Sequence, residues 1–281
     1  KDTILFGDCR KTIPTITEPV KMCVTSPPYY GLRNYGDEEN QIGMEESPEK
    51  YIEQLVEVFR SVRDVLTDDG ILWVNIGDTY YNYRSDGNYP KQTVSKTNQD
   101  LPSFSPVRGN KLEGYKSKDL IGIPWMLAFA LRKDGWYLRQ DIIWSKPNPM
   151  PESVRDRCTK SHEYIFLLSK SKNYYFDVDS IKESTIDGKG LKRKKSVWNI
   201  KTKPYKDAHF AVYPPELIEP CIMSGSQKGD IILDPFMGSG TTGMVAKSLG
   251  RHYIGCELHE SYGKLIQNRV SEYTINLENF V

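Results

Sequence analysis

Residues 230–243, with the sequence DIILDPFMGSGTTG, read as a short buried strand, a glycine-rich turn and the start of a helix. Gly238, Gly240 and Gly243 have the spacing G-x-G-x-x-G, and Glu257 ends the following strand. The first two glycines allow the backbone to approach a ligand, and the helix start offers free amides to a carboxylate or phosphate. An acid at the position of Glu257 suits a ribose hydroxyl. The segment therefore predicts a nucleotide-like site, although a tight turn with packing glycines would have the same spacing.

Strands and helices alternate along the chain, which is typical of an α/β fold with a mainly parallel sheet covered by helices on both faces. Ser47 is a suitable N-cap with Pro48 in the first helical position, and apolar residues follow at helical spacing until Asp69 and Gly70. Further helices are expected over residues 124–131, 241–249 and 262–270. Strands are expected over residues 3–6, 20–24, 71–75, 136–144, 163–168, 231–233 and 253–256.

Long polar segments interrupt this alternation. Residues 77–119 and 170–208 are far longer than ordinary connections between strands and helices, and residues 145–161 contain three prolines together with Arg155 and Arg157. Long loops on such a scaffold usually carry recognition. A chain of 281 residues suits one large domain or two small ones, and we expect a single domain with recognition loops.

The composition limits the class of protein. No run of about 18 apolar residues is present that would span a bilayer, and the first residues lack the pattern of a secretory signal. The chain has 5 cysteines, which are widely scattered and form no CxxC pair. That usage argues against a disulfide framework and a zinc site. We expect a cytoplasmic protein that binds neither a membrane nor a metal ion.

The net charge of +1 conceals a segregation of charge. Residues 189–206 contain eight basic residues and no acidic one, whereas residues 37–69 contain eleven acids against three bases. A charge run is often only a solvated face. Trp198 and Tyr205 lie within the basic run, which favours a nucleic-acid surface, and binding there would weaken steeply with salt.

Residues 25–29, with the sequence TSPPY, follow a buried strand and should lie at its carboxyl end, where open α/β sheets bind ligands. The two prolines fix the backbone, so that carbonyl groups and the Ser26 hydroxyl point in set directions. An exocyclic amine on a planar base needs such acceptors for its N–H groups, and Tyr29 supplies a flat ring on which the base can stack. A proline-stiffened turn with packing tyrosines is the alternative reading of the segment alone.

Together, TSPPY and residues 234–242 (DPFMGSGTT) resemble the DNA amino-methyltransferases that use S-adenosylmethionine, in particular the beta group, whose catalytic motif precedes the cofactor motif. The resemblance covers nearly the whole chain, with further matches in residues 136–139, 142–148, 162–165, 197–200 and 209–214. It implies a doubly wound, Rossmann-like sheet that is circularly permuted. The C-terminal half would supply the first two strands of this sheet, and residues 4–8 would supply the third.

The resemblance implies one methyltransferase domain over residues 1–281, with a catalytic half in 1–169, a candidate target-recognition loop in 170–208 and a cofactor-binding half in 209–281. The implied catalytic residues are Ser26, Pro27, Pro28 and Tyr29. The implied S-adenosylmethionine contacts are Asp8, Thr25, His209, Phe210, Asp234, Pro235, Phe236, Gly238, Ser239, Gly240, Thr241, Thr242 and Glu257. The candidate DNA contacts are Arg33, Arg155, Arg157, Lys192, Arg193, Lys194 and Lys195. Phe210 stands where proline is more usual, which weakens the assignment of His209 and Phe210.

Ser26 decides the expected target base. Family members with serine before the two prolines resemble cytosine-N4 methyltransferases, whereas aspartate or asparagine accompanies adenine N6. We therefore expect methylation of cytosine N4 in double-stranded DNA by a flipped-base mechanism, with adenine N6 as the alternative. A separate restriction endonuclease and a homodimer are possible partners. A dinucleotide-dependent oxidoreductase, a non-catalytic nucleic-acid-binding module and a methyltransferase for RNA or a protein amide are the rival interpretations.

Overall fold

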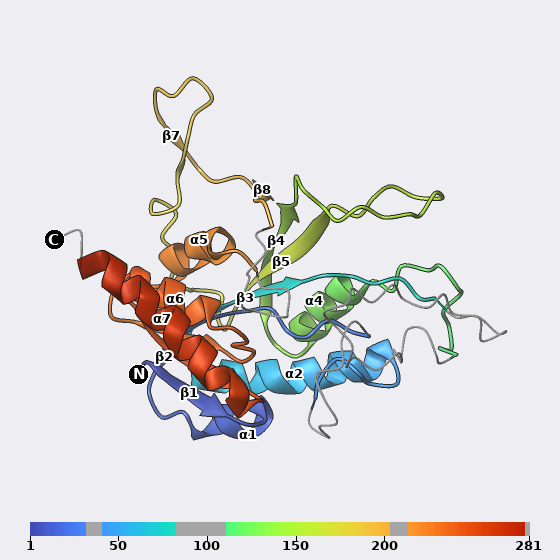
Figure 1. Cartoon of the computed structure of the whole chain (residues 1–281), viewed down its shortest axis with the longest axis horizontal. Helices are drawn as coiled ribbons and strands as arrows, with labels where there is room; N and C mark the ends of the chain where they lie inside the picture. Colours follow the sequence, from blue (N-terminus) through green and yellow to red (C-terminus); the bar gives the residue numbers. More distant parts are fainter. Residues whose placement is uncertain (32–40, 83–110, 203–212, 279–281) are drawn as a thin grey trace.

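The computed structural model describes residues 1–31, 41–82, 111–202 and 213–278, arranged as in Figure 1. They contain an eight-stranded sheet with the order β1-β10-β9-β2-β3-β5-β4-β8. The strands are β1 (Thr3–Phe6), β2 (Val20–Thr25), β3 (Leu66–Ile76), β4 (Tyr137–Ser145), β5 (His162–Ser169), β8 (Val197–Asn199), β9 (Ile231–Asp234) and β10 (His252–Glu257). Strands β1, β10, β9, β2 and β3 are parallel, β5 is antiparallel to both neighbours, and β8 is parallel to β4. The expected mainly parallel sheet is confirmed.

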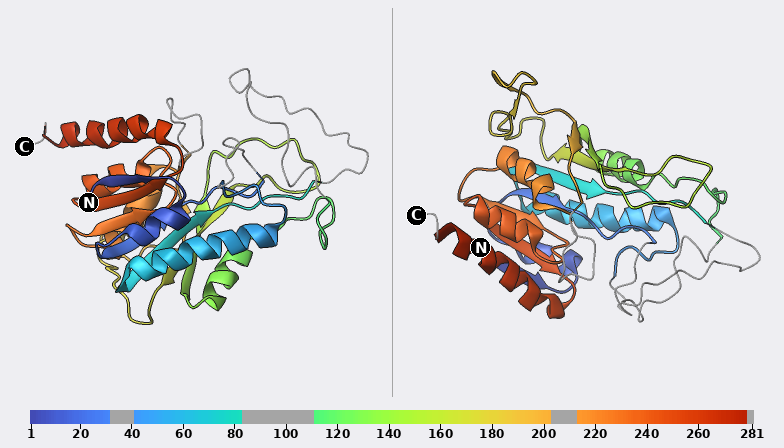
Figure 2. Two further views of the ribbon diagram at one scale, coloured as in Figure 1. Left: turned by 90° about the horizontal axis from the view of Figure 1, so that it is seen from below. Right: turned by 45° about the horizontal axis from the view of Figure 1, so that its top comes forward.

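Two layers of helices cover the sheet on opposite sides (Figure 2). One layer contains α1 (Cys9–Thr12), α2 (Pro48–Val65) and α4 (Ile123–Lys133), and the other contains α5 (Pro215–Gly225), α6 (Thr241–Ser248) and α7 (Gly263–Glu278). Strand β3 contributes side chains to the cores on both sides of the sheet, because successive side chains of a strand point to opposite faces. Leu72 and Val74 belong to the core under α2, whereas Ile71 and Trp73 belong to the core under α5 and α6.

The C-terminal strands β9 and β10 lie between β1 and β2, which come from the start of the chain. This is the order that the circular permutation predicts, with β9, β10 and β1 as consecutive neighbours. From β9 the chain winds outward to β10, whose outer edge pairs with β1, and from β2 it winds in the other direction to β3. The winding direction changes between β9 and β2. Ligands of doubly wound sheets bind outside the carboxyl ends of the strands at such a point.

Helix α2 begins as expected, since the Ser47 hydroxyl accepts a hydrogen bond from the Lys50 amide at 3.2 Å. It ends earlier than expected, at Val65, because Leu66 has extended backbone angles (φ −71°, ψ 146°) and begins β3. Asp69 and Gly70 therefore lie within a strand and do not end the helix. A side chain at Gly70 would lie 2.9 Å from the Thr67 carbonyl oxygen, which shows how tightly the chain packs there.

Several elements were not expected. Helix α5 begins at Pro215 and contains Pro220, and the two prolines obscure its helical pattern. Within residues 170–208, β6 (Glu183–Ser184) and β7 (Leu191–Lys192) form a two-stranded hairpin, and β8 extends the main sheet. The last helix begins at Gly263, after a short 3-10 turn at Glu260–Tyr262. Among the described residues, no helix combines the length and apolar character needed to cross a membrane.

Candidate active site

The TSPPY and DPFMGSGTT segments leave the sheet side by side. Strands β2 and β9 are parallel neighbours, with Cys23 opposite Leu233. β2 ends at Thr25 and β9 ends at Asp234, so that both segments begin at the same carboxyl edge. The Thr25 hydroxyl donates a hydrogen bond to Asp234 Oδ1 at 2.6 Å. The structure thus joins two motifs that are more than two hundred residues apart in the chain.

Asp234 is 1% exposed and accepts hydrogen bonds from several donors. Besides Thr25, the Phe236 amide donates to Oδ1 at 3.0 Å and the Tyr213 hydroxyl donates to Oδ2 at 3.1 Å. The Thr242 hydroxyl also donates to Oδ2. Burial raises the pKa of Asp234, and these donors oppose that effect. Thr25 and Thr242 both contact Asp234 inside the protein, and the direct contact of these three residues with a cofactor stays a prediction.

Tyr213 was not predicted as a site residue. Its hydroxyl contacts both Asp234 and Thr242, and burial raises its pKa well above the usual tyrosine range. The one sequence signal was its place in the family-like segment 209–214. Through these contacts, Tyr213 stabilises the residues on either side of the glycine-rich turn.

Glu257 ends β10, and its carboxylate accepts hydrogen bonds from the amides of Gly238 at 2.9 Å and His259 at 3.1 Å. Burial raises the pKa of Glu257, and those amides partly offset the shift. Next to it, Gly240 is the N-cap of α6 in a left-handed conformation (φ +86°). The Thr241 hydroxyl is buried and has no hydrogen-bond partner in the described parts of the chain. A carboxylate at this helix start would satisfy that hydroxyl, so these residues fit S-adenosylmethionine.

The rest of the DPFMGSGTT segment is largely internal. Pro235 is buried, and the Ser239 hydroxyl accepts a hydrogen bond from the Arg269 guanidinium. Phe236 and Gly238 are the partly exposed residues of the segment. Both residues can therefore face a ligand.

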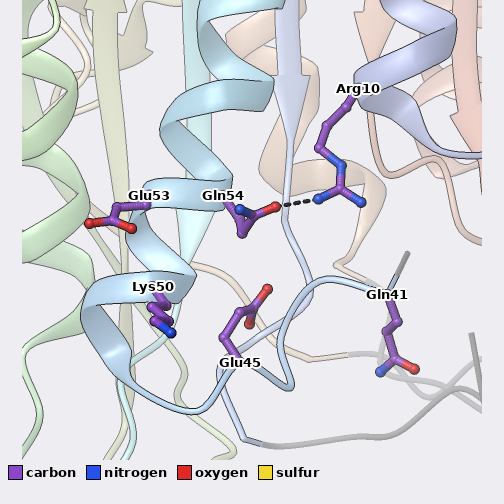
Figure 3. A pocket seen from close by; sticks show the side chains of 6 residues that line it. All are labelled: Arg10, Gln41, Glu45, Lys50, Glu53 and Gln54. Carbon is purple, nitrogen blue, oxygen red and sulfur yellow. Dashed lines mark hydrogen bonds between the residues drawn. The ribbon is translucent and has the colours of Figure 1, made fainter. Parts of the chain in front are cut away.

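Asp8 lies at the same edge of the sheet. The Gly7 amide donates to the Glu257 carbonyl at 2.9 Å, which places the end of β1 beside the end of β10. The Asp8 carboxylate caps α1 and contacts the Arg10 guanidinium at 2.9 and 3.1 Å. Arg10 also donates to Gln54 in α2, beside a polar pocket of about 400 Å³. The pocket is lined by Arg10, Gln41, Glu45, Lys50, Glu53 and Gln54 (Figure 3).

Contacts with α2 fix the backbone of the TSPPY segment. The Tyr51 hydroxyl donates to the Pro28 carbonyl at 2.7 Å, and the Tyr51 ring lies 5.4 Å from the Tyr30 ring. Gly43 has φ +108°, and a side chain there would lie 3.3 Å from the Tyr29 carbonyl oxygen. The segment is therefore held by side chains and by a close backbone approach, in addition to its prolines. Within it, Pro27 is buried and Ser26 is partly exposed.

The Tyr29 side chain is held at its ring and at its hydroxyl. Its hydroxyl donates to Glu163 Oε2 at 2.5 Å and lies 3.4 Å from Asn75 Oδ1. A side chain at Gly77 would lie 2.7 Å from Tyr29 Cε2, so the ring packs closely on the backbone after β3. Burial, followed by the nearby Glu163 carboxylate, raises the pKa of Tyr29 well above the usual tyrosine range. Glu163 was not predicted as a site residue, because it lies in an expected strand far from TSPPY in the sequence.

Arg155 and Arg157 lie in the loop between β4 and β5, which extends from the catalytic edge (Figure 1). Arg155 is exposed. The Arg157 guanidinium lies 3.9 Å from the centre of the Tyr80 ring and pairs with Glu152. The following strand supplies Glu163, the partner of Tyr29. The structure thus brings these two arginines to the edge that holds TSPPY.

Residues 192–195 have a different position. Strand β8 is parallel to β4, so residues that precede Val197 lie toward the opposite end of the sheet from the catalytic edge. In Figure 1 the β6–β7 hairpin projects from the side of α5. Lys194 lies 5.0 Å from the centre of the Trp198 ring. Trp198 is 5% exposed and packs 6.3 Å from Trp73, so the expectation that it belongs to a nucleic-acid surface is wrong.

Some predicted residues lie outside the described parts of the chain, namely Arg33, Tyr205, His209 and Phe210. Within the described parts, no group of three or more His, Cys, Asp or Glu side chains could hold a metal ion.

Comparison with known proteins agrees with this geometry. Residues 20–268 match the family model of the N6/N4 DNA methylases. The chain is 51% identical over 269 residues to the Type II methyltransferase M.SmaI of Serratia marcescens, and the match covers 95% of this chain and 90% of that protein.

Two solved structures share the fold. The cytosine-N4-specific PvuII DNA methyltransferase superimposes with a TM-score of 0.68 at 18% identity, over 95% of this chain and 85% of that one. A putative DNA modification methylase from Thermus thermophilus, in complex with S-adenosyl-L-methionine, superimposes with a TM-score of 0.65 at 23% identity, over 97% and 94%. Because the family model spans most of the chain and the M.SmaI match spans nearly all of it, the protein belongs to the N6/N4 family of DNA methylases.

Proposed function

We propose that the protein transfers the methyl group of S-adenosylmethionine to the exocyclic N4 amino group of a cytosine that is flipped out of double-stranded DNA. This proposal rests on the neighbouring positions of strands β2 and β9. TSPPY and DPFMGSGTT leave adjacent strand ends and are joined by the hydrogen bond between Thr25 and Asp234. A site for a methyl donor and a site for an amine therefore lie next to each other, as transfer between them requires.

The residues around the glycine-rich turn would hold the cofactor. S-adenosylmethionine, when bound, supplies a methyl group on a positively charged sulfur, and the attacking nucleophile takes the methyl group as it displaces the sulfur. Phe236 and Gly238 are the partly exposed residues that would line its site. Thr241 at the start of α6 would bind the carboxylate, Glu257 the ribose and Asp8 the adenine.

The TSPPY segment would hold the target amine. The Ser26 oxygen and the Pro27 carbonyl accept its N–H groups, which favours the pyramidal amine and stabilises the positive charge that develops on it. The Pro28 carbonyl already accepts from Tyr51, whereas the Pro27 carbonyl has no such partner among the described residues and is assigned this role. The Tyr29 ring stacks on the base, an interaction worth about 1–3 kcal/mol in nucleic-acid complexes.

Ser26 supports cytosine as the target base, since serine replaces the aspartate or asparagine that accompanies adenine N6. The fold shared with a methyltransferase described as cytosine-N4-specific is in keeping with that choice. Adenine N6 methylation is the second candidate, because the matching family contains both activities by name. The name Type II methyltransferase of a 51% identical relative supports a restriction-modification role, with a separate endonuclease as cytoplasmic partner. We further propose a single methyltransferase domain and leave a homodimer as a candidate assembly.

Nucleoside mass spectrometry tests this proposal. DNA from cells that express the chain is digested to nucleosides and compared with DNA from cells that express the Ser26→Ala variant. We expect N4-methylcytosine in the first sample and none above background in the second. N6-methyladenine alone would replace cytosine by adenine as the target, and the absence of both would refute DNA methylation by this chain.

Thr241→Val should weaken S-adenosylmethionine binding about tenfold without loss of stability. The Thr241 hydroxyl has no partner in the described chain, so removing it breaks no internal hydrogen bond, whereas a ligand carboxylate loses one. Isothermal titration with the cofactor and thermal unfolding measure the two effects. Thr185→Val, in the distant hairpin, is the matched control. A large loss of stability with unchanged affinity would show that Thr241 has only an internal role.

The two groups of basic residues should differ in their effect on DNA binding. Arg155→Gln with Arg157→Gln should weaken binding at all sequences and reduce the slope of log affinity against log salt by about one to two. The same neutralisation of Lys194 and Lys195 should change the slope less, because residues 192–195 lie away from the catalytic edge. Fluorescence anisotropy with a DNA duplex over a salt series measures both slopes. Equal slopes for the two double variants would contradict this assignment.

A further inference from the structure

The Tyr29 ring, which would stack on the target base, is anchored at two points. Its hydroxyl donates to Glu163 Oε2 at 2.5 Å and lies 3.4 Å from Asn75 Oδ1. On one side of the ring, a side chain at Gly77 would lie 2.7 Å from Cε2 and 3.2 Å from Cδ2, so the ring lies against the backbone that follows β3. Tyr29 is nevertheless partly exposed, which leaves part of its surface open to a ligand.

The two anchors restrict different motions of the ring. The hydroxyl lies on the axis through Cγ and Cζ, so a hydrogen bond at the hydroxyl fixes where this axis points. The ring can still turn about the axis, because the last torsion of a tyrosine side chain has broad minima. The contact with Gly77 limits this rotation, since it acts on ring atoms that lie away from the axis. Together the two anchors set the plane of the ring.

The Glu163 carboxylate is itself held in place. Oε2 also accepts from Asn75 Nδ2 at 3.2 Å, and Oε1 pairs with the Lys146 ammonium. Asn75 is fixed in turn, because its amide also donates to the Tyr164 carbonyl at 3.2 Å. Lys146 lies 4.3 Å from the centre of the Trp144 ring. The Glu163 and Lys146 side chains are 13% and 18% exposed, so water competes little for the carboxylate.

The Tyr29 hydroxyl keeps its proton in this environment. Burial, followed by the Glu163 carboxylate, raises the pKa of Tyr29 well above the usual tyrosine range. A carboxylate can only accept hydrogen bonds, so the single hydroxyl proton is directed to Glu163. A hydroxyl that donates to an ionised acceptor at this distance forms one of the stronger hydrogen bonds found in proteins. Glu163 is therefore a firm anchor for the free end of the ring.

We propose that Glu163 is a positioning residue that, through its hydrogen bond with the Tyr29 hydroxyl, holds the Tyr29 ring in the plane on which the flipped-out base stacks. This inference rests on the proposed function, because it assigns Glu163 to the capture of the target base. Stacking depends on the relative orientation of two planes, and a ring that is already fixed loses little freedom when the base arrives. Glu163 acts through Tyr29 and need not touch the base.

Tyr29→Phe tests the hydrogen bond with a small change, because phenylalanine retains the ring and removes the hydroxyl. Binding is measured by fluorescence anisotropy on two duplexes of one sequence, which contains the target base located by mapping methyl groups in DNA. One duplex keeps that base, and the other has an abasic site in its place. The variant should bind the intact duplex about fivefold to tenfold more weakly than the wild-type protein, and the abasic duplex within about twofold, since the abasic duplex offers no base to stack.

Tyr115→Phe is the matched control. The Tyr115 hydroxyl also donates to a glutamate, Glu49 Oε1 at 2.8 Å, at the start of α2. Its loss should change the affinity for neither duplex. A purely structural role of the Tyr29 hydroxyl would instead weaken binding to both duplexes in parallel with a loss of melting temperature.

Glu163→Gln replaces the carboxylate by an amide, which has one oxygen for the two partners of the carboxylate. If that oxygen accepts from Lys146, the amide nitrogen faces the Tyr29 hydroxyl, which then loses its acceptor. This variant should show the same loss on the intact duplex. In the double variant Glu163→Gln/Lys146→Met no ammonium competes for the amide oxygen, and binding to the intact duplex should return to within about threefold of the wild-type value. The double variant also lacks the unpaired buried ammonium that would destabilise Glu163→Gln.

Equal losses on the intact and the abasic duplex would overturn the proposal, and so would a Tyr29→Phe variant that binds the intact duplex as tightly as the wild-type protein. The proposed function has a separate outcome. If the wild-type protein transfers no methyl group to DNA, that function is wrong and the role of Glu163 falls with it. Methyl transfer by the wild-type protein, without a loss specific to the intact duplex in the variants, refutes the role of Glu163 alone.

Discussion

Ser26→Ala should lower the single-turnover rate of methyl transfer by about 10²–10³-fold, the usual cost of removing one preorganised hydrogen-bonding group from a reacting centre. The serine oxygen would accept an N–H of the amine as positive charge develops, and alanine offers no acceptor there. Pro27 would retain its carbonyl, so some activity should remain. Ser26 is partly exposed, so we expect little change in stability.

The rate is measured with enzyme in excess over a labelled DNA duplex, so that product release does not limit it. Dissociation constants for DNA and for S-adenosylmethionine are measured alongside. Ser61→Ala is the matched control, because within the described parts of the chain the Ser61 hydroxyl bonds only to its own helix, at the Glu57 carbonyl. A variant within about threefold of the wild-type rate would remove Ser26 from the mechanism and with it the main argument for the target base.

The sequence was most informative where function depends on the end of a strand. Thr25, Asp234, Glu257 and Asp8 each follow or end a parallel strand, and the carboxyl ends of such strands meet at one edge. Local patterns that locate the strands therefore also locate these residues. The family resemblance predicted that the C-terminal half supplies the first two strands of the sheet and residues 4–8 the third, and β9, β10 and β1 are consecutive neighbours.

Residues whose roles depend on long-range register could not be predicted in this way. Glu163 lies at the start of the antiparallel strand β5, and its contact with Tyr29 follows from the pairing of Ile76 with Tyr164. No local pattern in the sequence indicates that pairing. Trp198 shows the converse error, since a tryptophan among lysines resembles a nucleic-acid platform until β8 is seen to carry it into the core. Whether a single side chain is buried depends on the strand that pairs with its own strand. The residues next to it in the sequence do not reveal that pairing.

Asp234→Ala should lower the free energy of unfolding by about 2–4 kcal/mol and abolish detectable cofactor binding. The change leaves the Phe236 amide and the hydroxyls of Thr25, Thr242 and Tyr213 without their common acceptor in a buried site. Unsatisfied buried donors cost about 1–3 kcal/mol each. Part of that cost is offset, because the variant no longer buries the carboxyl group whose pKa burial raises.

Asp234→Asn separates hydrogen bonding from charge. The amide oxygen can replace Oδ1 and still accept from Thr25 and the Phe236 amide, while the hydroxyls of Tyr213 and Thr242 can reverse and accept from the amide nitrogen. This variant should therefore lose less than half as much stability as Asp234→Ala. Denaturant unfolding measures both, with Asp230→Ala as the control. Asp230 accepts one amide hydrogen bond, at 2.7 Å, in the turn before the same strand, and its loss should cost less than about 1 kcal/mol. Asp234→Ala would be no more destabilising than Asp230→Ala only if the buried hydrogen bonds to Asp234 add little to the free energy of unfolding. That result would contradict the conclusion that Asp234 holds the two motifs together.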